Sequence, residues 1–388
     1  MSKVFITLVG GQAIPAYQGV KYSESFKPDK VVLVHSDSSK EEADRVKIAV
    51  KDNYGNNVEF DYCMISPIDF GKIKSGAEKI KNKYIDDEVV VNITGGLKPW
   101  SIFFYNVFLS HPKATIVYVS QTNETINLSD NKTRDVKIDP KLRLKLCGVE
   151  LDTFKNNFFS DYTEEDFNVI KTIEEIRRIN LFHFFNLTDV NGSVERDISK
   201  KYSNETPDNQ TSDLVYNHAK SSATIDIYNR KNNSRDHYTL KSPHLAQILF
   251  NNAWFELKTA LAISKIPGVG EIWLNCIFLA DKENPDSALN EIDVIAEFNG
   301  RFVCVECKTF PYDTTDIDKF TSAIYNFCGD SAICIFAVND LPWNPKKKSD
   351  YLRAKNKCKD NNITIYNFSD MHSNLAKVVK KLLNRQNK

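Results

Sequence analysis

Runs of apolar residues alternate with amphipathic stretches over roughly the first 120 positions of the chain. Several of these runs are nearly continuous Val and Ile, a pattern typical of strands that are buried on both faces. The alternation predicts a Rossmann-like unit, in which helices cover both faces of a parallel sheet. The expected strands are residues 3–9, 31–35, 58–62, 88–93 and 114–119, and the expected helices are residues 40–50, 70–81 and 98–109.

A second pattern starts at residue 242 and continues through residue 388. Its order is helix, strand, hairpin, helix, strand, helix, strand, helix, which predicts another α/β unit, this time with a mixed sheet. The expected helices are residues 243–263, 316–327, 348–359 and 370–384, and the expected strands are residues 270–279, 290–298, 301–308, 331–338 and 363–368.

The segment between the two units has a weaker pattern. Residues 163–185 have helical periodicity, whereas residues 188–235 are rich in Asn, Ser, Thr and Asp. That polar stretch predicts a connector with a short hairpin, or a segment that is in part disordered. The expected domains are therefore an N-terminal domain over residues 1–140, a helical and polar connector over 141–241 and a C-terminal domain over 242–388.

The hairpin of the C-terminal unit sets its own register. Asn299-Gly300 separates the β-prone runs 290–298 and 301–308. Asn-Gly between two such runs indicates a two-residue type I′ turn, because both central residues need positive φ. Counting outward from this turn places Asp293 opposite Glu306, on the same face of the hairpin.

The same register places Glu291 opposite Lys308. Facing side chains have Cβ atoms about 5 Å apart, a distance at which two carboxylates destabilise a sheet unless a cation lies between them. A divalent metal ion would fill that role, and a neighbouring lysine suits the hydrolysis of a phosphodiester. The alternative is that these charges mark only the solvent-exposed face of an antiparallel hairpin.

Composition narrows the class of protein. The chain has 388 residues, and its 51 Lys and Arg balance its 51 Asp and Glu. A net charge of zero argues against binding nucleic acid through a global positive field, although a local basic groove stays compatible with it. The eight cysteines lack zinc-finger spacing and are expected to be reduced thiols. The sequence has neither a signal-peptide pattern nor a membrane-length apolar window, so we expect a cytoplasmic protein without a membrane partner.

Two glycine-containing loops follow strands of the N-terminal unit. Gly10-Gly11-Gln12 follows the first strand, and Thr94-Gly95-Gly96-Leu97-Lys98 joins the fourth strand to its helix. Open α/β sheets bind ligands at the carboxyl ends of their strands, and glycines let the backbone approach a phosphate. The alternative is that each Gly-Gly pair is only a tight strand-to-helix connection.

The C-terminal unit resembles the PD-(D/E)xK nuclease superfamily. The matching residues are Asp293 and the sequence Glu306-Cys307-Lys308, and Glu256 lies in the first helix, where many members have a glutamate. Ile292 stands in place of the proline that often precedes the aspartate. An exposed helix charge is the alternative role for Glu256.

This resemblance implies a metal-dependent mechanism. Asp293, Glu306 and the backbone carbonyl of Cys307 would hold Mn²⁺ or Mg²⁺ through oxygen ligands. The metal would activate a water for attack on the phosphodiester, and Lys308 would orient that water or stabilise the developing charge. Glu291 would either bind a second ion or pair with Lys308.

The N-terminal loop 94–98 resembles the Thr-Gly-Gly-x-Lys loop of CRISPR-associated Rossmann-fold (CARF) domains, and the loop 10–12 occupies the position of the first ligand loop of that family. CARF domains bind cyclic oligoadenylates on the two-fold axis of a homodimer. The ligand-binding residues that the resemblance implies are Gly10, Gly11, Gln12, Thr94, Gly95, Gly96, Leu97 and Lys98.

Taken together, the two halves resemble the CRISPR ancillary nucleases that carry one CARF domain and one PD-(D/E)xK domain. The resemblance implies a homodimeric endonuclease of type III CRISPR antiviral defence, allosterically activated by cyclic tetra-adenylate. It also implies cleavage of single-stranded RNA and DNA, with nicking of duplex DNA as a further activity. Two alternatives stay open: a non-catalytic, ligand-responsive regulator that binds nucleic acid, and an enzyme that degrades the cyclic nucleotide in its sensor domain.

Overall fold

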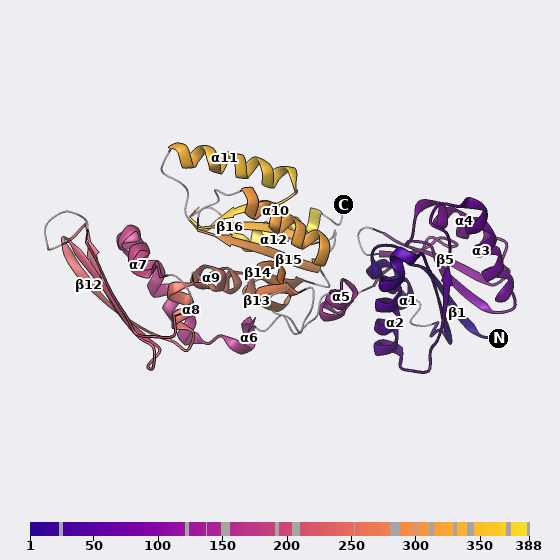
Figure 1. The fold of residues 1–388 in the computed structure, drawn as a ribbon, viewed down its shortest axis with the longest axis horizontal. Helices are drawn as coiled ribbons and strands as arrows, with labels where there is room; N and C mark the ends of the chain where they lie inside the picture. The colour runs from indigo at the N-terminus through magenta and orange to yellow at the C-terminus, as the bar shows by residue number, and fades with distance from the viewer. Residues whose placement is uncertain are drawn as a thin grey trace.

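Three sheets lie in a row along the molecule (Figure 1). The N-terminal sheet is at one end, a mixed sheet is in the centre and a smaller antiparallel sheet is at the other end. The computed structural model describes residues 1–385 except 23–25, 121–123, 137, 149–155, 191–193, 204–209, 252, 280–287, 299–300, 310–313, 329–331, 340–344 and 370–373.

The N-terminal sheet has the strand order β3-β2-β1-β4-β5-β6-β7. Its first five strands are parallel, and the last two are antiparallel additions at one edge. The strands are β1 (Lys3–Leu8), β2 (Lys30–His35), β3 (Glu59–Met64), β4 (Glu88–Asn92), β5 (Ala114–Val119), β6 (Glu124–Asn127) and β7 (Thr133–Asp135). The helices are α1 (Ala13–Tyr22), η1 (Asp37–Ser39), α2 (Lys40–Tyr54), α3 (Phe70–Lys83), α4 (Lys98–Phe108) and α5 (Pro140–Leu146).

Helices cover both faces of this sheet, as the apolar runs predict. The side chains of α1, α2 and α5 share one core with β1 and β2, and those of α3 and α4 share the opposite core. The Val and Ile positions of β1, β2 and β4 are therefore buried from both sides, which is why these strands lack a polar face. The sequence pattern did not reveal α1, β6 or β7.

The central sheet has the order β17-β16-β15-β14-β13-β8. β13, β14 and β15 are antiparallel, whereas β15, β16 and β17 are parallel, so the sheet is mixed. The strands are β8 (Asn156–Asn157), β13 (Val269–Leu279), β14 (Ala288–Phe298), β15 (Arg301–Lys308), β16 (Ile333–Val338) and β17 (Thr364–Asn367). The helices are α6 (Phe158–Asp161), α7 (Glu164–Thr188), α8 (Leu245–Phe250), α9 (Ala253–Ser264), α10 (Thr314–Ala323), the π-helix η4 (Ile324–Cys328), α11 (Pro345–Asp360) and α12 (Leu375–Arg385).

The polar middle of the chain contains more structure than a short hairpin. Residues 198–203 and 211–241 contain a four-stranded antiparallel sheet, β12-β11-β10-β9, that packs against α7. Its strands are β9 (Ile198–Ser203), β10 (Thr211–Asn217), β11 (Ser222–Asn229) and β12 (Ser234–Lys241). The structure thus has four strands where the sequence predicted a short hairpin, and the apolar pattern is weak because only one face of this sheet is apolar. The other face carries cross-strand charge pairs such as Arg235 with Asp226, so its composition resembles that of a loop.

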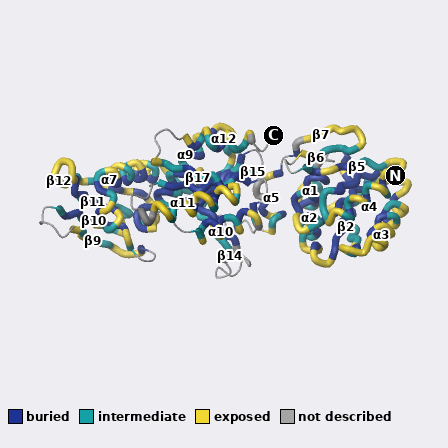
Figure 2. The backbone as a smooth tube through the Cα atoms, turned by 90° about the horizontal axis from the view of Figure 1, so that it is seen from above, coloured by how far each residue is buried: buried dark blue, intermediate teal, exposed yellow. Residues whose placement is uncertain are grey.

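The antiparallel sheet shares its hydrophobic core with the central sheet. Leu214 and Ile225 of the one belong to the same cluster as Ile272 and Val294 of the other, and α7 and α9 complete this cluster. Figure 2 shows that the buried residues are concentrated in the strands and that exposed residues lie on the outer helices. The expected domain boundary at residues 241 and 242 therefore divides one continuous core.

One local prediction is wrong, and another concerns residues that the structure does not describe. The single helix expected over residues 243–263 is two helices, α8 and α9, with Asn251 at the end of the first. The type I′ turn expected at Asn299-Gly300 lies outside the described residues.

The fold class is confirmed as α/β, with a mostly parallel sheet in the N-terminal region and mixed and antiparallel sheets beyond it. Within the described part of the chain, no helix has the length and apolar character needed to cross a lipid bilayer.

Candidate ligand cavity and candidate active site

The two glycine loops meet at the point where the strand order of the N-terminal sheet reverses. β1 lies between β2 and β4 and is parallel to both. The chain after β1 continues to the neighbour on one side, β2, and the chain after β4 continues to β5 on the other side. A crevice forms at such a switch point in open α/β sheets, and ligands bind there. Both loops thus lie at the carboxyl ends of adjacent parallel strands.

Close backbone contacts between the loops require their glycines. A Cβ atom on Gly95 would lie 1.9 Å from the carbonyl oxygen of Leu8, and one on Gly10 would lie 2.8 Å from the backbone nitrogen of Gly96. Gly96 also has a φ of 75°, the left-handed region that favours glycine. The loops are therefore packed main chain against main chain.

Asn92 fixes the second loop, a role that the sequence did not reveal. Its Oδ1 accepts hydrogen bonds from the backbone and the hydroxyl of Thr94, at 3.1 and 2.6 Å, and its Nδ2 donates to Pro15 O at 3.0 Å. Thr94 Oγ1 also accepts a hydrogen bond from Val119 N at 2.6 Å. The Thr94 side chain is thus engaged in holding the loop, and its hydrogen-bonding capacity is largely used within the protein.

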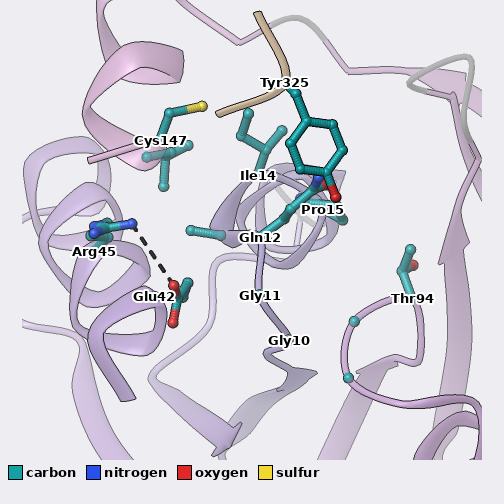
Figure 3. Close-up of a pocket in the computed structure, with 14 residues that line it drawn as sticks. Gly10, Gly11, Gln12, Ile14, Pro15, Glu42, Arg45, Thr94, Cys147 and Tyr325 are labelled. Carbon is teal, nitrogen blue, oxygen red and sulfur yellow. Dashed lines mark ion pairs between the residues drawn. The ribbon is translucent and has the colours of Figure 1, made fainter. Parts of the chain in front are cut away.

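A cavity of about 500 Å³ opens above these loops (Figure 3). Its lining includes most of the residues that the sequence predicts, whereas Leu97 and Lys98 are not part of it. The predicted residues that line it are Gly10, Gly11, Gln12, Thr94, Gly95 and Gly96. The further lining residues are Ala13, Ile14, Pro15, Glu42, Arg45, Leu146, Cys147 and Tyr325.

Arg45 and Glu42 bring charge to one wall of the cavity from α2. Arg45 Nη1 lies 4.0 Å from Glu42 Oε1, and Arg45 also pairs with Glu41 on the same helix. Glu42 Oε2 is buried without a hydrogen-bond partner among the described residues. The sequence spacing of these residues indicated only helix-surface ion pairs, so their place in the cavity follows from the packing of α2.

The second candidate site lies where β14 and β15 separate. The ladder between these strands has the predicted register from Phe298 opposite Arg301 to Val294 opposite Val305, where it ends. At the next position Asp293 Oδ2 accepts a hydrogen bond from Cys307 N at 2.6 Å. This contact takes the place of a regular pair, and it leaves Asp293 beside the peptide that follows Glu306.

Lys308 pairs with Glu306 in the structure. Lys308 Nζ lies 2.8 Å from Glu306 Oε1. The register of the hairpin predicts that Lys308 lies opposite Glu291, but among the described residues its ion pair is with Glu306. Glu291 is exposed on β14. The β14–β15 ladder ends at Val294 opposite Val305, so it does not continue to a Glu291–Lys308 pair.

Three carboxyl groups from three elements share this region. Asp293 and Glu306 are 8% and 7% exposed, which is rare for charged residues. Glu256 of α9 is half-buried, and its Oε2 is buried without a hydrogen-bond partner in the described part of the chain. The sequence could not distinguish this position from an exposed helix charge, and the structure brings Glu256 to the strand carboxylates.

Burial and mutual repulsion act on these groups. Burial raises the pKa of Asp293 to about 6, against the opposing charge of Lys308 and the hydrogen bond from Cys307. Burial and then the charge of Asp293 raise the pKa of Glu306 to about 8. Burial, followed by the charges of Asp293 and Glu291, raises the pKa of Glu256 well above its usual value. Burial and repulsion between these carboxyl groups thus favour their protonated forms when no cation is bound.

This donor set fits a hard divalent cation. Carboxylate oxygens are the ligands that Mg²⁺ and Mn²⁺ prefer, and a cation would relieve the repulsion and supply a partner for Glu256. The Cys307 thiol points away, toward Thr259 Oγ1 at 3.5 Å, so its carbonyl is the group available to an ion. In the described residues, no three His, Cys, Asp or Glu side chains form a ready-made metal cluster. An ion would therefore draw the carboxylates closer together.

Three residues near this site were missed from the sequence. The charge of Asp316, in the first turn of α10, acts on both Asp293 and Glu306. Tyr162 lies close enough to Glu256 that burial and this carboxylate raise the pKa of its phenol to about 12. Asn275 on β13 has a φ of 51° between two regular pairs with β14, across from Asp293. Only Asp316 had a sequence signal, as an acid opening the helix after the hairpin.

Comparison with known proteins identifies the N-terminal part of the chain. Its fold is that of a ligand-binding α/β domain with glycine loops at the switch point. Residues 4–146 match the family model of the Card1 CARF domain. This match agrees with the resemblance of the loops in this segment to those of CARF domains. No curated protein sequence matches the chain.

Solved structures share the fold of the whole chain. Can2 from Sulfobacillus thermosulfidooxidans, solved in complex with cyclic tetra-adenylate, is similar with a TM-score of 0.63 and 16% identity, over 100% of this chain and 99% of Can2. VC1899 from Vibrio cholerae is similar with a TM-score of 0.67 and 14% identity, over 99% and 96% of the two chains.

A third structure, a type III CRISPR defence DNA nuclease activated by cyclic oligoadenylate, has a TM-score of 0.50 and 15% identity. The match covers 99% of this chain and 52% of that nuclease. At such identities these likenesses establish the fold, and the chemistry has to be argued from the residues.

Proposed function

We propose that this protein is a metal-dependent endonuclease of type III CRISPR defence that is activated by a cyclic oligoadenylate, with cyclic tetra-adenylate as the leading candidate. The observation that carries the proposal is the presence in one chain of a CARF domain and, in a separate sheet, of buried carboxylates beside a lysine. The fold shared with Can2, which was solved with cyclic tetra-adenylate, supports it.

The proposed ligand site is the cavity above the glycine loops. Its volume of about 500 Å³ is within the range of small-molecule sites. Backbone N–H groups of loops 10–12 and 94–96 would receive phosphates, because the glycines leave no Cβ between the main chain and a ligand. Leu97 and Lys98 continue the second loop into α4 and complete the proposed contacts.

A homodimer is part of this proposal. Large apolar side chains are exposed around the start of α4, and Trp100 Nε1 donates to Ser66 O at 3.1 Å, which holds the β3–α3 loop against this helix. A second copy would cover such a surface, and a ring with two-fold symmetry would use both cavities. The exposed residues are Met64, Ile68, Phe70, Leu97 and Ile102.

The proposed active site contains Asp293, Glu306, Lys308 and Glu256. The three carboxylates and the Cys307 carbonyl would hold Mn²⁺ or Mg²⁺, which supplies Lewis-acid activation of water and phosphate when bound. Lys308, fixed by its 2.8 Å pair with Glu306, places a positive charge where charge develops on a scissile phosphate.

Burial opposes the charge on Lys308, but Glu306 and Asp293 outweigh it and raise the pKa of the ammonium, so Lys308 stays protonated. It would therefore act as an electrostatic stabiliser or a donor that orients water, and not as a base. Glu291 remains a secondary candidate, for a second ion.

The proposed substrates are single-stranded RNA and DNA, with nicking of duplex DNA as a further activity. Purified protein would be incubated with each labelled nucleic acid in Mn²⁺, with and without cyclic tetra-adenylate. Cleavage that needs the ligand is the expected result. Cleavage without ligand would contradict the gating, and absence of cleavage with every cyclic oligoadenylate would favour a non-catalytic regulator.

Degradation of the ligand is tested separately. The Glu306→Ala variant would be incubated with cyclic tetra-adenylate, and the ligand would be analysed for linear products. We expect the ring to stay intact, and linear products would assign a second activity to the sensor domain.

A further inference from the structure

The ligand cavity is not closed by the CARF domain alone. Tyr325, in the π-helix η4, lines it together with the glycine loops and with Leu146 and Cys147 at the end of α5. η4 continues α10 of the central, nuclease-like unit. Figure 3 shows the Tyr325 ring entering from that side, with its hydroxyl directed toward the start of α1. One wall of the proposed sensor site thus comes from the unit that it would regulate.

Tyr325 has the chemistry of a base-binding residue. Its side chain is 67% exposed, although its neighbours Ile324 and Cys328 are buried. A tyrosine ring offers a face on which an adenine stacks, while the glycine loops on the opposite wall suit phosphates. The cavity therefore combines the two kinds of contact that a cyclic oligoadenylate needs.

The element that carries Tyr325 is firmly attached to the central sheet. Phe327 stacks on Phe278 of β13, with ring centroids 4.3 Å apart and planes 10° from parallel. At its other end, the continuous α10–η4 segment begins beside Asp316, whose charge acts on Asp293 and Glu306. A ligand that contacts Tyr325 would therefore contact the same continuous segment that lies beside the candidate active site. π-Helical turns are frequent at functional sites.

We propose that Tyr325 stacks on an adenine of the bound cyclic oligoadenylate and thereby fixes the α10–η4 segment of the nuclease-like unit when the ligand is present. This inference rests on the proposed function and adds a ligand contact from outside the CARF domain. With the ligand bound, one position of α10 relative to the N-terminal domain is favoured, because only in that position does Tyr325 contact the adenine. A ligand can switch a protein only through such a difference in contacts between two states.

The test compares Tyr325→Ala, Tyr325→Leu and Tyr325→Phe with the wild type. Phe185→Ala is the matched control, because Phe185 is also an exposed aromatic residue, 51% exposed on α7, and does not line the cavity. Cyclic tetra-adenylate binding is measured by calorimetry, and ligand-dependent cleavage is measured as the ligand concentration that gives half-maximal rate. Circular dichroism melting verifies that each variant is folded.

Loss of the ring should weaken binding roughly 5- to 150-fold in the Ala and Leu variants, the range for loss of one base–aromatic stack, and shift half-maximal activation by a similar factor. Tyr325→Phe and Phe185→Ala should stay near the wild type, since the first keeps the ring and the second is remote from the ligand. Unchanged binding in Tyr325→Ala and Tyr325→Leu would overturn the inference while leaving the proposed function intact. A wild type that neither binds nor responds to any cyclic oligoadenylate would overturn both.

Discussion

The candidate ligand cavity and the candidate active site differ in the groups that form them. The cavity is made largely of backbone, with Gly95 packed on the Leu8 carbonyl and Gly10 on Gly96. The active site is made of side-chain charge, with Asp293 and Glu306 almost completely buried. Packing holds the first site in shape without a ligand, whereas the second retains repulsion that only a cation or a proton relieves.

This difference indicates which perturbation each site should resist. Added volume should damage the sensor loops, and with them ligand binding and activation, while the carboxylates of the central sheet stay in place. Loss of charge should abolish the chemistry while leaving the loops, and therefore ligand binding, intact. Each variant below tests one side of that contrast.

The largest expected effect is on catalysis. Glu306→Ala should eliminate detectable cleavage, because it removes a proposed metal ligand and the partner of Lys308. Lys308→Ala should lower the cleavage rate about 10²- to 10³-fold, the usual loss for one electrostatic stabiliser. Gel assays with labelled RNA and DNA measure both.

Binding of cyclic tetra-adenylate should be unchanged in these two variants. Asp318→Ala is the control, since Asp318 is a carboxylate on α10 that pairs with Lys357 on the surface. Cleavage at the wild-type rate in both Glu306→Ala and Lys308→Ala would mean that the site is elsewhere.

The next effect is on the stability of the sensor. Gly95→Ala would place a Cβ 1.9 Å from the Leu8 carbonyl oxygen, so the loop must move. We expect a loss of about 3 kcal/mol in the free energy of unfolding of this domain, the upper part of the range for overpacking. Urea denaturation followed by circular dichroism measures it.

Gly11→Ala is the matched control, because a Cβ on Gly11 meets nothing within 4 Å. Its free energy of unfolding should change by no more than about 0.5 kcal/mol. Equal effects of the two substitutions would show that the backbone contact does not determine the loop.

Divalent metal should stabilise the protein through the other site. Mn²⁺ at 100 times its dissociation constant should add about 2.7 kcal/mol to the free energy of unfolding, by mass action. Glu306→Gln keeps the volume of the side chain but removes its charge, so most of this gain should disappear. Thermal melting with Mn²⁺ and with EDTA measures it, and an equal Mn²⁺ effect in the variant would place the ion elsewhere.

The smallest expected effect concerns the strand opposite Asp293. Asn275 has a φ of 51°, a conformation that costs a β-branched residue more than it costs Asn or Gly. Asn275→Val should lower the free energy of unfolding by roughly 1–2 kcal/mol, whereas Asn275→Gly should be nearly neutral. Chemical denaturation separates them, and the reverse order would show that the side chain of Asn275 matters more than its backbone.

Some features were readable from the sequence because they depend on near neighbours in the chain. The Val- and Ile-rich runs predicted β1, β2 and β4, and the register from Phe298 to Val294 followed from a two-residue gap. The four-stranded sheet of residues 198–241 was not readable, because its outer face is paired charge and only its inner face is apolar.

Periodicity, turn geometry and residue chemistry are local properties. The alternation of strands and helices, the glycine loops and the set of Asp293, Glu306 and Lys308 could therefore be predicted from the order of the residues. Three further relations were seen first in the folded chain: Lys308 pairs with Glu306, Glu256 approaches them from α9, and Tyr325 lines the candidate ligand cavity. These relations join residues that are distant in the chain or lie where two strands part. They depend on how whole elements pack, which no local pattern encodes.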